Sequence, residues 1–509
     1  MPRRNGLFRL NEICVQYIAN HIEFWCEDYT KNYMGKHSFL HIIGPFEDLT
    51  SEQVQKVLST LQRKRQLARH HLQLLLHNRV QHLDLSGCSK IINDQMIYVV
   101  AARCKRLKNL NLSNCSRVSS KAFLTLADKL SDAICLNLKQ TRCIGDALRL
   151  IITNCTKLRE LNLQGVQVND SDIFLMCQAA QKGEGCCRLV SLDVLDTWVT
   201  EKAVTAVINH LPEIRHLNCN NVFVIFPEGM ERHGQEIDGC DVGIAPNKMC
   251  KLKSLTAENP NALITDNNLF VTCLHCPEVT KVVLAGPHGF TDAGLRHIVS
   301  LNKLKELTIS SHHNNISFSG GVLPILQAVG KKITHLHLQD LEDIDVYAIG
   351  FLCPELQSLN IDVRSLDICN FISESSFNTQ AVGQRRNPFD KLRKLVMYAQ
   401  EENMTDDTML VLLKHSHELE TVDIIHMGSF KDAVLLEALE NNRLLKLCKL
   451  SVFGCGSLSH APITQLLLDD QNEIGDIRLL ECREISLQDS RDFLKIIRKG
   501  RYNVTLEWT

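Results

Sequence analysis

The sequence has no excess of charge of either sign. Its 509 residues include 56 lysine and arginine side chains against 58 aspartate and glutamate side chains, which gives a formal net charge of −2. Proteins that bind nucleic acid need a strongly basic surface to attract the phosphate backbone. We therefore expect no general affinity for nucleic acid.

Long apolar runs are also missing. No stretch approaches the roughly 20 consecutive apolar residues that cross a bilayer as a helix. The opening residues, MPRRNGLFRLNEIC, are basic but show neither the apolar core nor the small-residue cleavage site of a secretory signal. We expect no membrane partner, and a location in the cytoplasm, the nucleus or both.

Motifs that carry catalysis are absent as well. The sequence contains no G-x-x-x-x-G-K-[ST], no G-x-G-x-x-G after a strand, no H-E-x-x-H and no G-x-S-x-G. Adjacent histidines such as His70 and His71 point in different directions on a helix, so we do not expect them to chelate a metal. The chain is interpreted as a non-enzyme with no cofactor and no metal site.

What the sequence does contain is a repeat. The segments VQHLDLSGCSKIINDQMI, LKNLNLSNCSRVSSKAF and LRELNLQGVQVNDSDIF share L-x-x-L-x-L, a short turn and a helical stretch. The middle apolar position recurs about every 28 residues, within the leucine-rich-repeat range of roughly 20–29. We call these sixteen positions rungs: Leu83, Leu110, Leu136, Leu161, Leu192, Leu217, Leu255, Val282, Leu307, Leu336, Leu359, Leu395, Val422, Leu450, Ile477 and Val504.

This spacing predicts an α/β fold. Alternation of L-x-L places two apolar side chains on one face of a short strand, and helical spacing follows. One unit cannot bury its apolar face alone, so successive units stack into a solenoid. We expect one continuous leucine-rich-repeat horseshoe over residues 80–509, with strands on the concave side, preceded by an all-α segment over residues 1–79.

The cysteines follow the same period. Cys104, Cys155, Cys276 and Cys353 each lie six residues before a rung, and Cys88, Cys115, Cys455 and Cys482 each lie five residues after one. A buried cysteine behaves as a small hydrophobic residue. We predict that the first four are buried and form no disulfide. Cys273 and Cys276 form a C-x-x-C, but the sequence has no second pair of ligands that would complete a zinc site.

Two long steps in the ladder contain inserts, at residues 220–250 and 364–390. Both are rich in Gly, Pro, Ser and Asn, and such inserts map to loops on one face of a solenoid. The first holds an apolar cluster that includes Phe223 and Phe226. A strand or loop tucked onto the neighbouring repeat and an exposed patch for a partner are both compatible with this cluster.

Residues 1–79 do not repeat but show helical spacing. Leu10, Cys14 and Ile18 lie at i, i+4 and i+8, on one face of a helix. This pattern resembles the BC box that binds Elongin C, with Arg9 where the motif has Ser, Thr or Pro. The next segment, LTSEQVQKVLSTL, resembles the cullin box of the Zyg-eleven and Zer-one group of ligase receptors, and also the start of an F-box, with Thr50 in place of Pro.

These resemblances imply an adaptor-binding box, and the repeats resemble those of F-box leucine-rich-repeat proteins. The implied adaptor-binding residues are Leu10, Cys14, Ile18, Leu49, Val54, Val57, Leu58 and Leu61. The implied function is substrate recognition in a cullin-RING ubiquitin ligase, with Elongin B/C and a cullin as partners. An F-box protein with a Skp-type adaptor, a non-ligase scaffold and a plain helical cap on the first repeat remain open alternatives.

The target protein is expected on the concave strand face. Polar side chains flank several rungs there and suit hydrogen-bonded recognition of a protein segment. The candidate substrate-binding residues are Asn109, Asn111, Glu160, Asn162, His216, Asn218, His335 and His337, together with Phe223 and Phe226 of the first insert.

Overall fold

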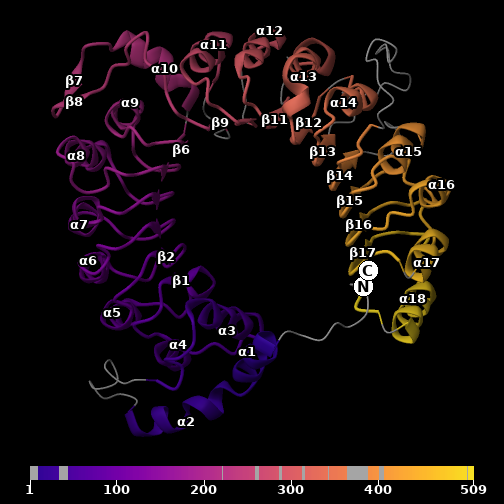
Figure 1. The fold of residues 1–509 in the computed structure, drawn as a ribbon, viewed down its shortest axis with the longest axis horizontal. Coiled ribbons are helices and arrows are strands. Elements are labelled where there is room, and N and C mark those ends of the chain that lie inside the picture. The colour runs from indigo at the N-terminus through magenta and orange to yellow at the C-terminus, as the bar shows by residue number, and fades with distance from the viewer. Residues whose placement is uncertain are drawn as a thin grey trace. The chain divides into compact units, whose positions relative to one another are not determined.

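The computed structural model describes residues 10–33, 44–220, 222–257, 263–285, 289–311, 316–341, 343–363, 388–399, 406–469, 471–500 and 502–509. They divide into two compact units, which we call the N-terminal unit, ending at Lys253, and the C-terminal unit, beginning at Ser254. Both units are built from leucine-rich repeats (Figure 1). Among the described residues, no helix combines the length and the apolar character needed to cross a bilayer.

Among the residues that the structure describes, four helices precede the first strand. They are α1 (Leu10–Asn20), α2 (Ile22–Tyr33), α3 (Ser51–Arg63) and α4 (Arg69–Leu75). Helix α2 includes the polar residues that follow Trp25 and ends at Tyr33. Helix α3 begins where Thr50 accepts a hydrogen bond from the backbone N–H of Gln53, whose side chain in turn accepts from the Thr50 backbone. Thr50 is thus the N-cap of α3, a role that favours a hydroxyl side chain.

The N-terminal unit holds a six-stranded parallel sheet in sequence order. Each rung from Leu83 to Leu217 pairs with the rung of the next strand and is buried. The strands are β1 (His82–Asp84), β2 (Asn109–Asn111), β3 (Cys135–Asn137), β4 (Glu160–Asn162), β5 (Ser191–Asp193) and β6 (His216–Asn218). The helices are α5 (Asp94–Arg103), α6 (Ser120–Ala127), α7 (Asp146–Asn154), α8 (Asp170–Gln181) and α9 (Glu201–His210).

The C-terminal unit holds a ten-stranded parallel sheet, again in sequence order. The strands are β9 (Ser254–Ala257), β10 (Lys281–Leu284), β11 (Glu306–Ser310), β12 (His335–Gln339), β13 (Ser358–Val363), β14 (Lys394–Ala399), β15 (Thr421–Ile425), β16 (Lys449–Phe453), β17 (Asp476–Leu480) and β18 (Thr505–Trp508). The helices are α11 (Asp266–His275), α12 (Asp292–Leu295), α13 (Leu323–Val329), α14 (Val346–Leu352), α15 (Asp406–Lys414), α16 (Asp432–Asn442), α17 (His460–Leu468) and α18 (Leu487–Gly500).

The sixteen predicted rungs correspond to sixteen strands, with one correction at the end of the chain. Ile477 pairs with Leu506, so Leu506 is the last rung and Val504 precedes strand β18. The described strands form two sheets, β1–β6 and β9–β18. A single continuous horseshoe over residues 80–509 stays a prediction. The α/β leucine-rich-repeat fold with N-terminal helices is confirmed.

The first insert contains the interruption. It forms helix α10 (Val222–Glu231) and a small hairpin of β7 (Glu236–Ile237) and β8 (Cys240–Asp241). Asp238 and Gly239 both have positive φ, which matches the two-residue turn typical of tight hairpins. Phe223 and Phe226 are buried on α10, which packs against α9. The segment is therefore tucked onto the neighbouring repeat as one alternative expected, but as a helix rather than a strand or loop, and the exposed patch is wrong. Residues 364–387 of the second insert lie outside the described residues.

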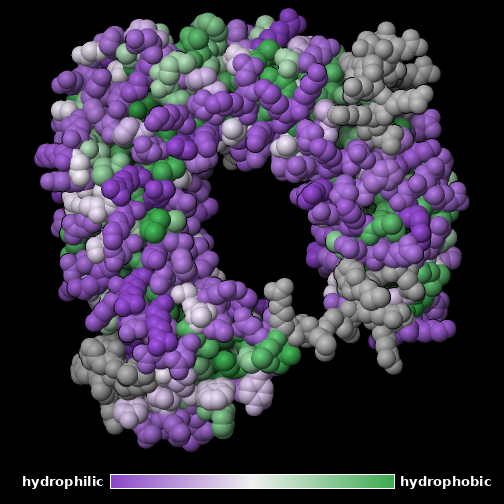
Figure 2. All heavy atoms as spheres, in the orientation of Figure 1, coloured by the Kyte–Doolittle hydropathy of each residue, from purple (hydrophilic) through white to green (hydrophobic). Residues whose placement is uncertain are grey.

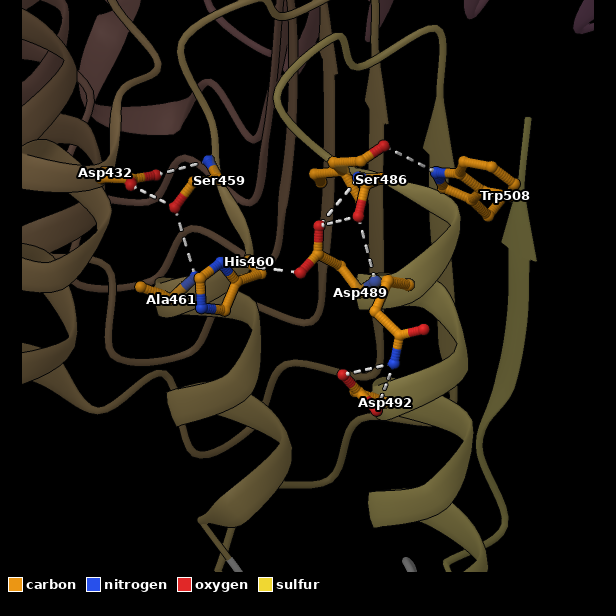
Figure 3. A network of polar contacts seen from close by, with 10 residues as sticks. Asp432, Ser459, His460, Ala461, Ser486, Asp489, Asp492 and Trp508 are labelled. Carbon is orange, nitrogen blue, oxygen red and sulfur yellow. Dashed lines mark hydrogen bonds and ion pairs between the residues drawn. The ribbon is translucent and has the colours of Figure 1, made fainter.

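A repeated polar contact joins neighbouring repeats. An aspartate in the first turn of one helix accepts hydrogen bonds from both the backbone N–H and the hydroxyl of the next helix's N-cap residue. Asp432 accepts in this way from Ser459, which also caps α17 (Figure 3). The other pairs are Asp94 with Ser119, Asp170 with Thr200, Asp266 with Thr291 and Asp292 with Ser317.

The repeat cysteines are buried as predicted. Cys104, Cys155, Cys276 and Cys353 are at most 1% exposed, and Cys88, Cys115, Cys455 and Cys482 are also buried. Burial raises the pKa of Cys104, Cys155 and Cys353 to about 12, so these thiols are protonated at neutral pH. They pack as small apolar side chains.

Candidate adaptor-binding helix and strand faces

Helix α1 leaves an apolar face open to solvent. Leu10 is 76% exposed, Cys14 is also exposed and Ile18 is half-buried, so the three predicted residues lie on one partly open helix face. Ile13 and Tyr17, which the motif resemblance did not single out, are 48% and 57% exposed. Hydrophobic surface gathers over α1 in Figure 2. This surface, which we call the α1 face, consists of Leu10, Ile13, Cys14, Tyr17 and Ile18.

The opposite side of α1 attaches the helix to the unit. Val15 and Ala19 are buried, and α1 packs on α3. Asn11 Oδ1 accepts a hydrogen bond from Gln53 Nε2 of α3 at 3.2 Å, and Lys64 donates to Asn20. The α1 face is therefore presented by a helix whose other side is already fixed.

Helix α3 covers the open edge of the first sheet. The side-chain amide of Gln55 exchanges two hydrogen bonds with the backbone of Asp84 in β1, at 3.0 and 3.1 Å, as a neighbouring strand would. The Ser51 hydroxyl accepts from the backbone N–H of Gln81 at 2.8 Å. An unpaired sheet edge invites association with other chains, and a repeat array needs such a terminal cap. The capping role considered for the N-terminal helices belongs to α3.

The apolar residues of α3 form part of the core. Val54, Val57, Leu58 and Leu61 are at most 1% exposed, and Leu49 before the helix is half-buried. A partner cannot contact the first four without unfolding this segment, so their prediction as adaptor-binding residues is corrected. The sequence showed an apolar helix face but not what covers it. The signal for Ile13 and Tyr17 was their i, i+3, i+4 spacing with Leu10 and Cys14.

The strand face of the N-terminal unit carries six of the predicted substrate-binding residues. Asn109, Glu160 and His216 lie in one row across β2, β4 and β6, and Asn111, Asn162 and Asn218 in the next. The second row also has a structural role, because the side-chain oxygens of Asn111 and Asn162 accept backbone N–H bonds two residues further on, at 3.0 and 2.9 Å. Those two side chains shape the turn after the strand.

His335 and His337 lie in a hollow on the strand face of the C-terminal unit. The hollow has a volume of about 150 Å³ and spans β10 to β14. Lys281, Glu306 and Lys394 also line it, and Lys281 forms an ion pair with Glu306 at 3.3 Å. We call this the β10–β14 hollow. Its mixture of cationic, imidazole and amide groups suits a polar or acidic peptide segment more than an apolar one.

An apolar row begins beside this hollow. Tyr398, Ile425, Phe453 and Leu480 pair in register across β14 to β17, and each is half-buried. The His426 ring stacks edge-on against Phe453, with ring centroids 4.9 Å apart. These side chains occupy the outward position three residues after each rung. The sequence contained a signal for this row: an apolar residue occurs at a position where a solvent-exposed strand face would carry a polar residue.

Comparisons with known proteins place the chain among leucine-rich-repeat proteins. No family model matches it. The DNA repair protein rhp7 of Schizosaccharomyces pombe is 22% identical over 313 residues, which cover 59% of this chain and 45% of rhp7. The F-box/LRR-repeat protein 4 of Bos taurus is 30% identical over 141 residues, 27% of this chain and 21% of that protein. The chain thus spans less than half the length of these curated relatives.

A solved structure supports the fold over most of the chain. Yeast Rad7, crystallised in a complex with Elc1, matches 92% of this chain with 98% of its own length, at a TM-score of 0.51 and 15% identity. The DNA repair protein RAD7 of Saccharomyces cerevisiae is also 26% identical over 136 residues, 27% of this chain and 24% of RAD7. The chain has a leucine-rich-repeat fold, and parts of it are similar in sequence to F-box/LRR-repeat protein 4 and to the rhp7 and RAD7 proteins.

Proposed function

We propose that this chain is a non-catalytic substrate-recognition subunit of a cullin-RING ubiquitin ligase. Its α1 face binds an Elongin C-type adaptor, and through it Elongin B and a cullin. Its strand faces hold a target protein. The gain in ubiquitin transfer comes from a raised effective concentration of the target near the charged conjugating enzyme.

One observation carries the adaptor half of the proposal. Leu10 and Cys14 point to solvent from a helix whose opposite side is packed on α3. A cap on the first repeat would bury these side chains, whereas an adaptor-binding helix must present them. A small thiol between two larger apolar residues suits a tight apolar pocket. Rad7, a chain of the same fold, forms a complex with a second protein, Elc1.

The F-box alternative is less well supported by the burial of α3. Leu58 and Leu61, the apolar pair on which that resemblance depends, pack inside the N-terminal unit. A Skp-type adaptor would have to replace contacts that hold the first sheet edge. The same unit offers the α1 face without any rearrangement.

The target is assigned to the strand face of the C-terminal unit. There the β10–β14 hollow lies beside the apolar row that starts at Tyr398, so polar and apolar contacts are available on one surface. Interfaces bind through a few buried aromatic or apolar anchors surrounded by polar contacts. Phe453 and Tyr398 are the expected anchors, and His335 and His337 the expected hydrogen-bonding groups.

Co-expression separates the adaptor classes. The full chain is co-expressed with Elongin B/C in one culture and with a Skp-type adaptor in another, then purified by a tag on the chain. We expect a stoichiometric complex with Elongin B/C and none with the Skp-type adaptor. Recovery of the Skp complex alone would establish the F-box alternative, and recovery of neither would favour a scaffold.

A further inference from the structure

A cluster of metal-binding side chains lies where α2 meets α4, apart from the α1 face. Nε2 of His70 and Nε2 of His71 both face the carboxylate of Glu23 on α2, at 3.6 and 3.0 Å from its two oxygens. The ligand atoms of these three residues all lie within 4.8 Å of one another. Helices α2 and α4 pack together in the N-terminal unit (Figure 1).

The adjacent histidines converge, contrary to the expectation that they would diverge along a helix. They occupy the first turn of α4, and their ring centroids lie 4.0 Å apart with the planes tilted by 65°. The two rings therefore bring one nitrogen each to the same side of the helix. One histidine beside one carboxylate would indicate a simple hydrogen bond. Here two imidazole rings face the same carboxylate.

The separations suit a tetrahedral cation. Bonds of roughly 2.0–2.2 Å from zinc to nitrogen and carboxylate oxygen place neighbouring ligand atoms about 3.3–3.6 Å apart in a tetrahedron. The two nitrogen–oxygen distances of 3.0 and 3.6 Å bracket that spacing. These distances reach different oxygens of Glu23, and the three ligand atoms lie within 4.8 Å of one another, so side-chain rotation must bring them closer together. The Glu23 side chain is 77% exposed and has room to rotate.

His71 adds an independent observation. Its side chain is only 1% exposed, and its Nε2 atom makes no hydrogen bond within normal geometric limits, although Glu23 Oε1 is close. A buried polar atom of this kind needs a partner, and a metal ion would supply one.

We propose that Glu23, His70 and His71 bind a divalent transition-metal ion, with zinc as the expected occupant. Two imidazole nitrogens and one carboxylate oxygen are ligands that zinc accepts, and the exposed side of Glu23 leaves a fourth position for water. The ion connects α2 to α4, and therefore anchors the helix pair α1–α2 to the segment that enters the first strand. This proposal is independent of the proposed ligase role.

Metal binding requires a change of tautomer in the His71 ring. Nδ1 lies 3.2 Å from the Ala68 amide nitrogen, a contact in which Nδ1 accepts and the proton resides on Nε2. Binding through Nε2 requires that proton to move to Nδ1, so the Ala68 amide loses its acceptor on the ring. The ring keeps one proton throughout and releases none.

The test is zinc titration of the chelator-stripped full chain against a competing chromophoric chelator. We expect the wild type to bind one equivalent more than His70→Ala or Glu23→Gln, each losing at least ~10-fold in affinity, the loss that even an outer-shell partner can cause. The matched controls, Glu27→Gln one turn further along α2 and His82→Ala on β1, keep wild-type binding. Equal zinc affinity in the wild type and both ligand variants, or no saturable site, would overturn the proposal.

Two further measurements guard against misfolding. Melting curves in chelator should agree among all the variants, because Glu23 and His70 are partly exposed, and added zinc should raise the melting temperature of the wild type and controls only. Cobalt substitution of the wild type should give the intense visible bands of a four-coordinate site. A six-coordinate cobalt spectrum would contradict the site whatever the variants do.

Discussion

At the scale of single residues, burial separates two groups of cysteines. The cysteines that lie six positions before a rung are shielded from solvent, whereas Cys14 on α1 and Cys448 are exposed. The shielded group could be predicted from spacing alone, because every repeat places the same position in the core. Cys14 could not be assigned in this way, since no repeat defines its surroundings. Its exposure follows from the packing of α1 through Val15 and Ala19.

The raised pKa of the shielded thiols predicts a loss of stability in alkali. An unfolded thiol ionises near pH 9.0, whereas the folded Cys104 thiol has a pKa of about 12 because burial disfavours its charge. The folded chain therefore retains a proton that the unfolded chain loses, and the unfolding free energy falls as pH rises from about 9 to about 12. Below pH 9 this thiol adds no pH dependence.

Urea unfolding between pH 8 and pH 11 checks this prediction. Cys104→Ala should reduce the alkaline slope by up to ~1.4 kcal/mol per pH unit, the full contribution of one proton. Cys14→Ala, which removes an exposed thiol, should leave the slope unchanged. An unaltered slope in Cys104→Ala would mean that this thiol ionises in the folded chain as it does in water.

At the scale of elements, polar contacts between helix ends fix the stacking of repeats. The aspartate of one helix's first turn binds the N-cap residue of the next, in both units. Each contact satisfies a backbone N–H and a hydroxyl together, and it places a negative charge at the positive end of the next helix. The contact differs at α18, where Asp489 accepts hydrogen bonds from the backbone N–H and the hydroxyl of Ser486, at the start of its own helix (Figure 3). The Trp508 indole donates to the Ile485 carbonyl.

A double-mutant cycle measures one of these contacts. Asp432→Ala and Ser459→Ala should each destabilise the chain by about 1–2 kcal/mol, with a coupling of about 0.5–1.5 kcal/mol between them. Asp146→Ala is the matched control, since Asp146 has the same place in α7 but only a loose 3.9 Å ion pair with Arg149. Additive losses in the cycle would mean that the contact adds nothing to stacking.

The same elements show what the sequence could and could not predict. Period and alternation located every strand of the two parallel sheets, because a repeat imposes one burial pattern many times, but they did not reveal the β7–β8 hairpin. Helix α10 was missed, since its run of five apolar residues from Val222 fits strand and helix equally, and Pro227 suggested a turn rather than a helix interior. The covered face of α3 and the convergence of His70 with His71 depend on contacts distant in sequence, which one-dimensional patterns do not contain.

At the scale of the whole molecule, the chain consists of two repeat units, each with its own parallel sheet. Repeats contact mainly their neighbours, so stability is close to a sum of local terms and unfolding need not involve the full length. The sequence predicted the number of rungs but not the division, because the ladder's period resumes after the insert. Only the pairing of strands separates β1–β6 from β9–β18.

This division predicts that damage stays within one unit. Leu110→Ala removes a buried rung of β2 and should cost the N-terminal unit about 2–5 kcal/mol. Hydrogen exchange followed by mass spectrometry should show faster exchange across β1–β6, while β13–β18 keep wild-type protection. Leu450→Ala in β16 is the reciprocal control. Equal acceleration in both units by either variant would show a single cooperative structure.

The central claim is that α1 presents its apolar face to an Elongin C-type adaptor. The most direct measurement is the affinity of purified Elongin B/C for the wild type, Cys14→Asp and Gln16→Asp, recorded beside their melting curves. Asp at position 14 buries an unpaired charge at the interface, so binding should fall by at least ~100-fold, since each ~1.4 kcal/mol is tenfold. Gln16→Asp adds the same charge to an exposed site on the same helix, away from Leu10 and Cys14, and should bind as the wild type does. All three chains should melt together, because Cys14 is exposed in the folded chain. A wild type that binds no Elongin B/C, or a Cys14→Asp chain that binds it fully, would contradict the account.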